Sequence, residues 1–289
     1  MNVKATENFN EYRQTIVKVT MLYFIGIFLL RLWSVVLPFQ LNQPVLHNVN
    51  FDFTVAVFMI SGLPEFLSHN TAANWTFSIL LLLLPLLSFF KSQARWPIIL
   101  FSLVFFIYKL FNNLYVTHQQ HYLNFAWFIT LPFFARSGKG FDLLWQGIRY
   151  YACWFYVTAF LLKIINGGFF QEEFGALTIK TQMGNYIFAH PHAVQTYLYT
   201  YLLQHPFWLH AGTKLTLLLE GVFVIGFFTR KYDKWLVLAG FLIFAFTAFS
   251  TDVFFIEQFF AIAIAFTSPA LWKKWGKWLS VKPSTPEYG

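Results

Sequence analysis

Lys163 is the residue of this sequence whose surroundings most suggest chemistry. It lies near the end of an apolar, aromatic stretch, residues 150–170, that is long enough to cross a lipid bilayer. A lysine inside a membrane span is costly to insert, so its presence needs a reason. One interpretation is that the long side chain extends its ammonium group to the membrane surface. The other is a buried site in which the amine takes up a proton.

Further ionisable residues occur within the predicted spans, and most of them fall at a similar depth on the outer side. Such residues usually face a helix-bundle interior or a watery cavity. Their grouping predicts one cavity that opens to the outside and is covered by residues 167–210. The alternative is separate pairs that lock helices together, such as Lys109 with Glu257 or Arg31 with Glu220. The candidate members of the cavity are Arg31, Lys109, His118, His121, Lys163, Glu220, Asp252 and Glu257.

Metal and nucleotide sites find little support in the sequence. His118 and His121 are three positions apart and could share a helix face as metal ligands, but no cysteine or carboxylate is near them in sequence. Hydrogen-bonding histidines are therefore favoured, and no metal is predicted. The glycine motifs of phosphate and dinucleotide sites and the nucleophile elbow of hydrolases are missing.

Composition identifies an integral membrane protein. Hydrophobic residues make up 57% of the chain and charged residues only 11%, where soluble domains carry about 25% charged residues. The net charge of +8 does not indicate nucleic-acid binding, because the basic residues lie in short loops between apolar stretches, where they set membrane orientation. The partner that this composition predicts is the lipid bilayer.

An all-α, polytopic membrane bundle of about eight spans, with both termini in the cytoplasm, fits the alternation of basic and non-basic loops. Residues 51–66 are apolar but shorter than a span, so an interfacial or re-entrant helix ended by Gly62 and Pro64 is expected. The Trp- and Lys-rich segment 271–280 is expected to anchor at the interface, and residues 1–289 are expected to form one domain. The expected spans are 19–39, 75–90, 96–115, 121–135, 150–170, 212–228 and two within 235–269.

Three stretches together resemble the membrane domain of the vitamin K-dependent gamma-glutamyl carboxylase and its bacterial relatives, the horizontally transferred transmembrane (HTTM) family. The resemblance covers residues 100–270, and the order of its elements matches that of the family. The stretches are LFNNLYVTHQQHYLNFAWF (110–128), FYVTAFLLKIINGGFF (155–170) and LTLLLEGVFVIGFFTRKYDKWLVLAGFLIFAFTAF (215–249).

The resemblance implies a role for two residues. Lys163 falls on the family's lysine, which is held to be the base that deprotonates vitamin K hydroquinone, and His121 falls on the family's histidine. The sequence also departs from the family, because Thr247 stands where the carboxylase has a histidine. The chain ends soon after the last expected span, without the large lumenal domain of the carboxylase. Carboxylation of a protein substrate is therefore not expected.

These observations predict a bacterial inner-membrane protein with an outward-facing pocket that binds or deprotonates a quinone-like cofactor, either a quinone or its hydroquinone. In this hypothesis Lys163 abstracts the proton and His121 orients the resulting anion. Whether the protein is an enzyme is left open. The alternatives are a non-enzymatic membrane partner or maturation factor for a secreted peptide, and a small-solute transporter. The residues expected to bind the substrate are Lys109, Arg31, Glu220 and Glu257.

Overall fold

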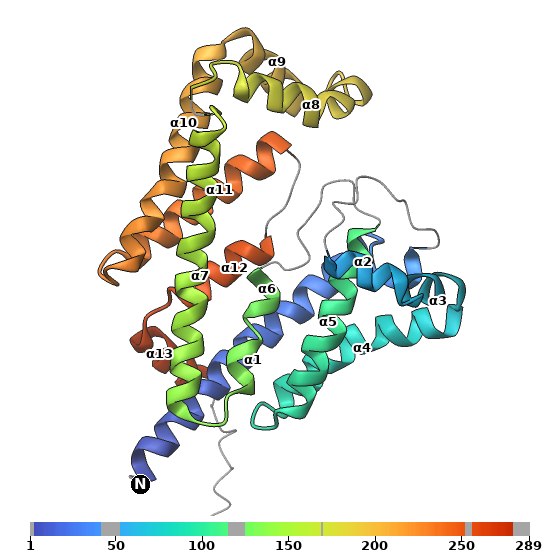
Figure 1. Cartoon of the computed structure of the whole chain (residues 1–289), viewed down its shortest axis with the longest axis vertical. Helices are drawn as coiled ribbons and strands as arrows, with labels where there is room; N and C mark the ends of the chain where they lie inside the picture. The colour runs from blue at the N-terminus through green and yellow to red at the C-terminus, as the bar shows by residue number, and fades with distance from the viewer. Residues whose placement is uncertain (1–2, 42–52, 115–124, 169, 252–255, 280–289) are drawn as a thin grey trace, which may run out of the picture. The chain divides into compact units, whose positions relative to one another are not determined.

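Helices account for the regular structure of the described chain (Figure 1). The computed structural model describes residues 3–41, 53–114, 125–168, 170–251 and 256–279. Within these ranges there are α-helices and short 3-10 helices but no strand, so the prediction of an all-α protein is confirmed.

The helices form two compact units. Unit one comprises residues 1–144 and 268–289, and unit two comprises residues 145–267. The long helix α7 (Gly138–Ile165) continues through the boundary between them. A boundary inside a continuous helix needs no glycine- or proline-rich linker, which is why the sequence pointed to one domain over 1–289.

Unit one is organised around an aromatic core. Its long helix α1 (Val3–Trp33) packs against α4 (Thr71–Phe90) and α13 (Pro269–Leu279), and α4 packs against α5 (Trp96–Asn113). Each pair of buried aromatic rings in contact contributes about 0.5–1.5 kcal/mol to stability, in addition to the effect of the apolar area that it buries. The rings buried in this core include Phe24, Phe28, Phe101, Phe105 and Tyr108.

The apolar segment near residue 60 forms two short helices, α2 (Phe53–Ile60) and α3 (Leu63–His69). Gly62 separates them with a φ of +69°, a left-handed conformation that glycine adopts without strain. The helix expected over 51–66 therefore breaks at Gly62 as predicted. Pro64, however, lies in the first turn of α3 and starts a helix instead of ending one, because proline fits the first turn, where its missing amide is not needed.

The fourth expected span, 121–135, does not form one long helix in its described part. Residues 115–124 lie outside the described residues. The part that follows contains only α6 (Phe125–Phe128) and the 3-10 helix η2 (Leu131–Phe134). Pro132 is one physical reason, because proline has no amide hydrogen to continue an α-helix from the preceding turn.

In unit two, a pair of helices lies across one end of the long helices (Figure 1). Helix α10 packs against α11 and α8, and α11 also packs against α12 and α8. The two crossing helices are α8 and α9, and they occupy the segment 167–210 that was predicted to cover a cavity. The helices besides α7 are α8 (Phe174–Ala189), α9 (Val194–Gln204), α10 (Pro206–Val222), α11 (Asp233–Thr251) and α12 (Ile256–Ala265).

A small buried cluster fixes the crossing helices to the long ones. Ile179 and Met183 of α8, Tyr199 of α9 and Leu209 of α10 pack together. The Tyr199 hydroxyl also donates a hydrogen bond to the carbonyl of Phe249 in α11 at 2.8 Å. This apolar cluster, together with the partly buried hydrogen bond of Tyr199, holds α8 and α9 over the ends of α10 and α11.

Five helical segments are long and apolar enough to cross a membrane by length and composition. The described residues also include two shorter apolar helices, α5 and α12. This fits a multi-pass integral membrane protein. Two spans were expected within 235–269, and residues 252–255, which include Asp252, lie outside the described residues. The five segments are Glu11–Gln40, Thr71–Phe90, Gly138–Ile165, Pro206–Phe227 and Asp233–Ser250.

Candidate functional site

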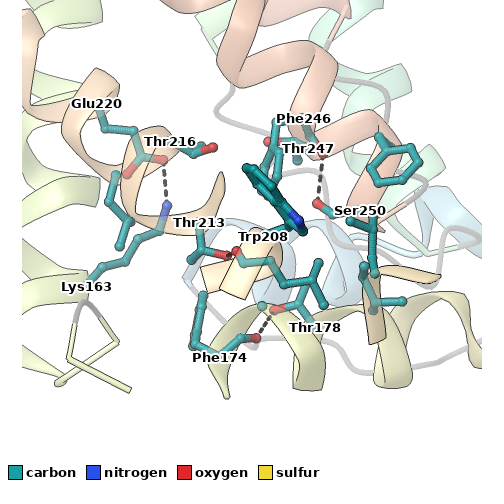
Figure 2. Close-up of a pocket in the computed structure, with 16 residues that line it drawn as sticks. Lys163, Phe174, Thr178, Trp208, Thr213, Thr216, Glu220, Phe246, Thr247 and Ser250 are labelled. Atoms are coloured by element: carbon teal, nitrogen blue, oxygen red, sulfur yellow. Dashed lines mark hydrogen bonds and ion pairs between the residues drawn. The ribbon is translucent and has the colours of Figure 1, made fainter. Parts of the chain in front are cut away.

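Lys163 and Glu220 form an ion pair inside unit two (Figure 2). Lys163 lies in the last turn of α7, which ends just before Gly167, a residue with a φ of +77°. Its ammonium nitrogen is 2.5 Å from Oε1 of Glu220 in α10. The sequence had offered Arg31 as a partner for Glu220, and the partner in the structure is Lys163.

The two members of this ion pair differ in exposure. The Lys163 side chain is 37% exposed, whereas that of Glu220 is only 7% exposed. Among the described residues, Oε2 of Glu220 has no hydrogen-bond partner. A buried carboxylate oxygen without a donor carries an unfavourable desolvation cost of about 1–3 kcal/mol or more. One oxygen of this carboxylate is therefore satisfied by Lys163, and the other is buried without a hydrogen-bond partner among the described residues.

A cavity of about 260 Å³ adjoins this ion pair. Its walls come from α7, α8, α9, α10 and α11, and they are mainly apolar and aromatic with a few polar groups. This composition is typical of small-molecule sites. The lining residues are Lys163, Phe174, Gly175, Thr178, Ile179, Leu202, Trp208, Leu209, Thr213, Thr216, Leu217, Glu220, Phe246, Thr247, Phe249 and Ser250.

Four hydroxyl groups of the cavity wall form the same kind of hydrogen bond, to a carbonyl of their own helix. Each donates its proton to the carbonyl four residues earlier in its own helix, at 2.8 or 2.9 Å. A hydroxyl used in this way retains its oxygen as an acceptor. Together with the open oxygen of Glu220, the wall thus offers mostly acceptors, and Lys163 is a donor. The four residues are Thr178, Thr213, Thr216 and Ser250.

The close approach of α8 to α10 shapes the cavity. Gly175 allows it, because a Cβ atom at this position would lie 2.6 Å from Oγ1 of Thr213 and 3.1 Å from the carbonyl oxygen of Leu209. A side chain here would therefore push α8 away from α10. Gly184, further along the same helix, has no atom within 4 Å of its corresponding position.

The structure places the predicted site residues in different parts of the chain. Lys163 and Glu220 come together in the cavity. Arg31 and Lys109 belong to unit one, where the Arg31 guanidinium carbon lies 5.0 Å from the centre of the Tyr108 ring. His118 and His121 lie outside the described residues, as does Asp252.

Glu257 lies in α12 of unit two and is 3% exposed. It is not among the residues that line the cavity. Within the described residues, no group of three or more histidine, cysteine, aspartate or glutamate side chains could hold a metal ion. The described site therefore consists of one ion pair, aliphatic and aromatic walls, and hydroxyl groups.

Sequence reasoning missed most of the wall. Thr213, Thr216 and Glu220 follow one another at spacings of three and four in an apolar helix, which places them on one face. This polar stripe was the available signal, and only Glu220 was singled out. Thr247, noted for standing where the resemblance expects a histidine, proves to line the cavity. Trp208 gave no signal, because aromatic residues are abundant throughout the chain.

No protein-family model, no curated protein and no solved structure matches the chain, so the function has to be argued from the geometry of this cavity.

Proposed function

We propose that this chain is a multi-pass membrane protein whose unit two binds a lipid-soluble, ring-containing ligand of the quinone class in the Lys163–Glu220 cavity. The observation that carries the proposal is the open oxygen of a buried carboxylate, held by a lysine beside a cavity with aromatic walls. Buried polar atoms in proteins are nearly always satisfied, so an unpartnered carboxylate oxygen on a residue that lines a cavity supports a bound ligand.

The walls favour a flat ring. Four aromatic side chains line the cavity, and such rings pack well against another ring in an offset-stacked or edge-to-face arrangement. The volume of about 260 Å³ is slightly below the roughly 300–1,000 Å³ of ordinary ligand pockets, which suits a ring head group better than a whole lipid. Trp208, which is 59% exposed, marks a side through which an apolar tail can leave. The four rings are Phe174, Trp208, Phe246 and Phe249.

The polar groups favour a ligand that exchanges a proton. A hydroxyl on the ring could donate to the open oxygen of Glu220, and its anion could be stabilised by the ammonium of Lys163. The resemblance to the HTTM family and the vitamin K-dependent carboxylase implies the same class of cofactor. It also implies that Lys163 is the base and that His121 orients the resulting anion.

Mass spectrometry of the compounds extracted from the purified protein tests the proposal. We expect a quinone-class compound in equimolar amount with wild-type protein, and its loss in Thr216→Trp, which puts a large ring into the cavity. Leu215→Trp is the matched control, because Leu215 is 57% exposed on the same helix and does not line the cavity. An extract without any ring compound, or equal amounts in both variants, would contradict the proposal. An empty extract would favour a membrane partner for a secreted peptide.

We propose in addition that the protein crosses a bacterial inner membrane about eight times, with both termini in the cytoplasm. The support is the distribution of basic residues among the loops. The re-entrant or interfacial segment 51–66 then lies on the outer side.

Cysteine labelling tests this topology. In a background with Cys153→Ala, single cysteines at Gln120 and Ser137 are expected to react from opposite sides of the membrane, because the proposed fourth span lies between them. Labelling of both positions from the cytoplasm would rule out that span and would invert the orientation of the loops that follow.

A further inference from the structure

We infer that Glu220 accepts the proton of the ligand and that Lys163 is the positioning residue that holds this carboxylate and then the ligand's anion. This inference rests on the proposed function above. It assigns the role of proton acceptor to Glu220 in α10, whereas the resemblance assigns it to Lys163 in α7.

The first argument concerns Lys163. Its nitrogen donates a hydrogen bond to Oε1 of Glu220 at 2.5 Å. A lysine that forms an ion pair of this kind is an ammonium group, which has three donors and no lone pair for a further proton. Lys163 is therefore occupied as a donor.

The second argument concerns Glu220. The residue is 5% exposed and lines the cavity, and in the described part of the chain its Oε2 atom has no hydrogen-bond partner. An ionised carboxylate is an acceptor through both oxygens. The neighbouring hydroxyls of Thr213 and Thr216 give their protons to helix carbonyls and cannot fill this position at the same time. Among the described residues, the Oε2 atom of Glu220 is thus a buried carboxylate acceptor without a donor, on a residue that lines the cavity.

The proton transfer balances within the site. The O–H bond of a ring hydroxyl breaks, and its proton forms a bond with Oε2 of Glu220. The electron pair stays on the ligand oxygen, which becomes an anion, and Glu220 becomes a neutral carboxylic acid. The negative charge moves from Glu220 to the ligand, while Lys163 remains an ammonium group next to it. Because the charge of the site is unchanged, the ion pair is kept and only its negative partner is replaced.

Two spectroscopic readouts on one probe test this assignment. The probe is 4-nitrophenol carrying a short alkyl chain, whose anion absorbs visible light. Visible absorption shows whether the bound probe is an anion, and infrared difference spectra show whether a carboxyl group has become protonated. In wild-type protein we expect a bound anion together with a new C=O band of a protonated carboxyl group. If Lys163 takes the proton, the anion appears without that band.

Three variants assign the band. Glu220→Gln is expected to lose it, because the acceptor is removed while the size of the side chain is kept. Lys163→Arg is expected to retain both signals, since arginine keeps the charge but cannot act as a base. Lys163→Met is expected to lose the bound anion, because no cation then stabilises it. Glu173→Gln, which changes an exposed carboxylate before α8, is the control and should retain the band.

The outcomes distinguish a failure of the proposed function from a failure of the assignment of the proton to Glu220. Failure of the probe to bind wild-type protein would contradict the proposed function. A bound anion in wild-type protein without the carboxyl band, and its loss in Lys163→Arg, would overturn the inference while leaving ligand binding intact. A band that persists in Glu220→Gln would also overturn it, because another carboxylate would then hold the proton.

Discussion

Arg149→Ala is expected to lower the free energy of unfolding by about 3–5 kcal/mol, the usual cost of removing one partner of a buried ion pair. Arg149 is 3% exposed in α7 and its guanidinium donates at 2.7 Å to Oδ1 of Asp233, at the start of α11. It also donates at 2.6 Å to the carbonyl of Gly226 and at 2.7 Å to that of Thr229. The substitution therefore leaves a carboxylate and two carbonyl groups without their donors.

Chemical unfolding in detergent, followed by circular dichroism, measures this change. Arg149→Lys is expected to restore little, because a single ammonium group cannot reproduce the planar fork that reaches all three acceptors. Arg230→Ala, an exposed arginine close to the same turn, is the control and should change the free energy by no more than about 0.5 kcal/mol. Equal effects of Arg149→Ala and Arg230→Ala would show that the buried network does not hold α7 to α11.

Gly175→Ala is expected to destabilise the protein by about 1–3 kcal/mol, the usual cost of overpacking a close contact. The new methyl group would meet the Thr213 hydroxyl and the main-chain carbonyl of Leu209, and a main-chain atom cannot rotate away. Helix α8 would have to move from α10, and the cavity that both helices line would change with it.

Gly184→Ala provides the matched control on the same helix. No atom lies within 4 Å of its added methyl group, and alanine is favoured over glycine inside a helix by about 0.5–1 kcal/mol. The two substitutions are thus expected to change the unfolding midpoint in opposite directions in the same denaturant titration. A stabilising effect of Gly175→Ala would show that α8 does not pack on α10 as closely as described.

The sequence was informative where a single segment carries the signal. The long apolar stretches at α4, α7, α10 and α11 were predicted as spans and form long helices, although α7 ends at Ile165, before the predicted end of its span at residue 170. The prediction was less accurate at residues 121–135. There the apolar composition suggested a span, but Pro132 and a turn interrupt the described part, and composition averages over such a break.

The candidate site was predictable only in part. Lys163 and Glu220 were each conspicuous as charged residues in apolar stretches, so their types could be noticed one at a time. Their pairing depends on which helices are neighbours, and residues 57 positions apart in sequence carry no local record of that. The contribution of α8 was also hidden, because Gly175 works through the absence of a side chain.

The central claim is that a ring ligand binds in the Lys163–Glu220 cavity, and a fluorescence titration of Trp208 tests it most directly. Trp208 lines the cavity, whereas Trp235, at the start of α11, does not. A short-chain quinone added to the purified protein, with bound ligand first removed, is expected to quench wild-type protein and Trp235→Phe with the same saturable curve. The saturable part should be clearly smaller in Trp208→Phe, because Trp208 is the tryptophan among the lining residues of the cavity. A saturable part of unchanged size in Trp208→Phe, or no saturation in wild-type protein, would contradict the claim.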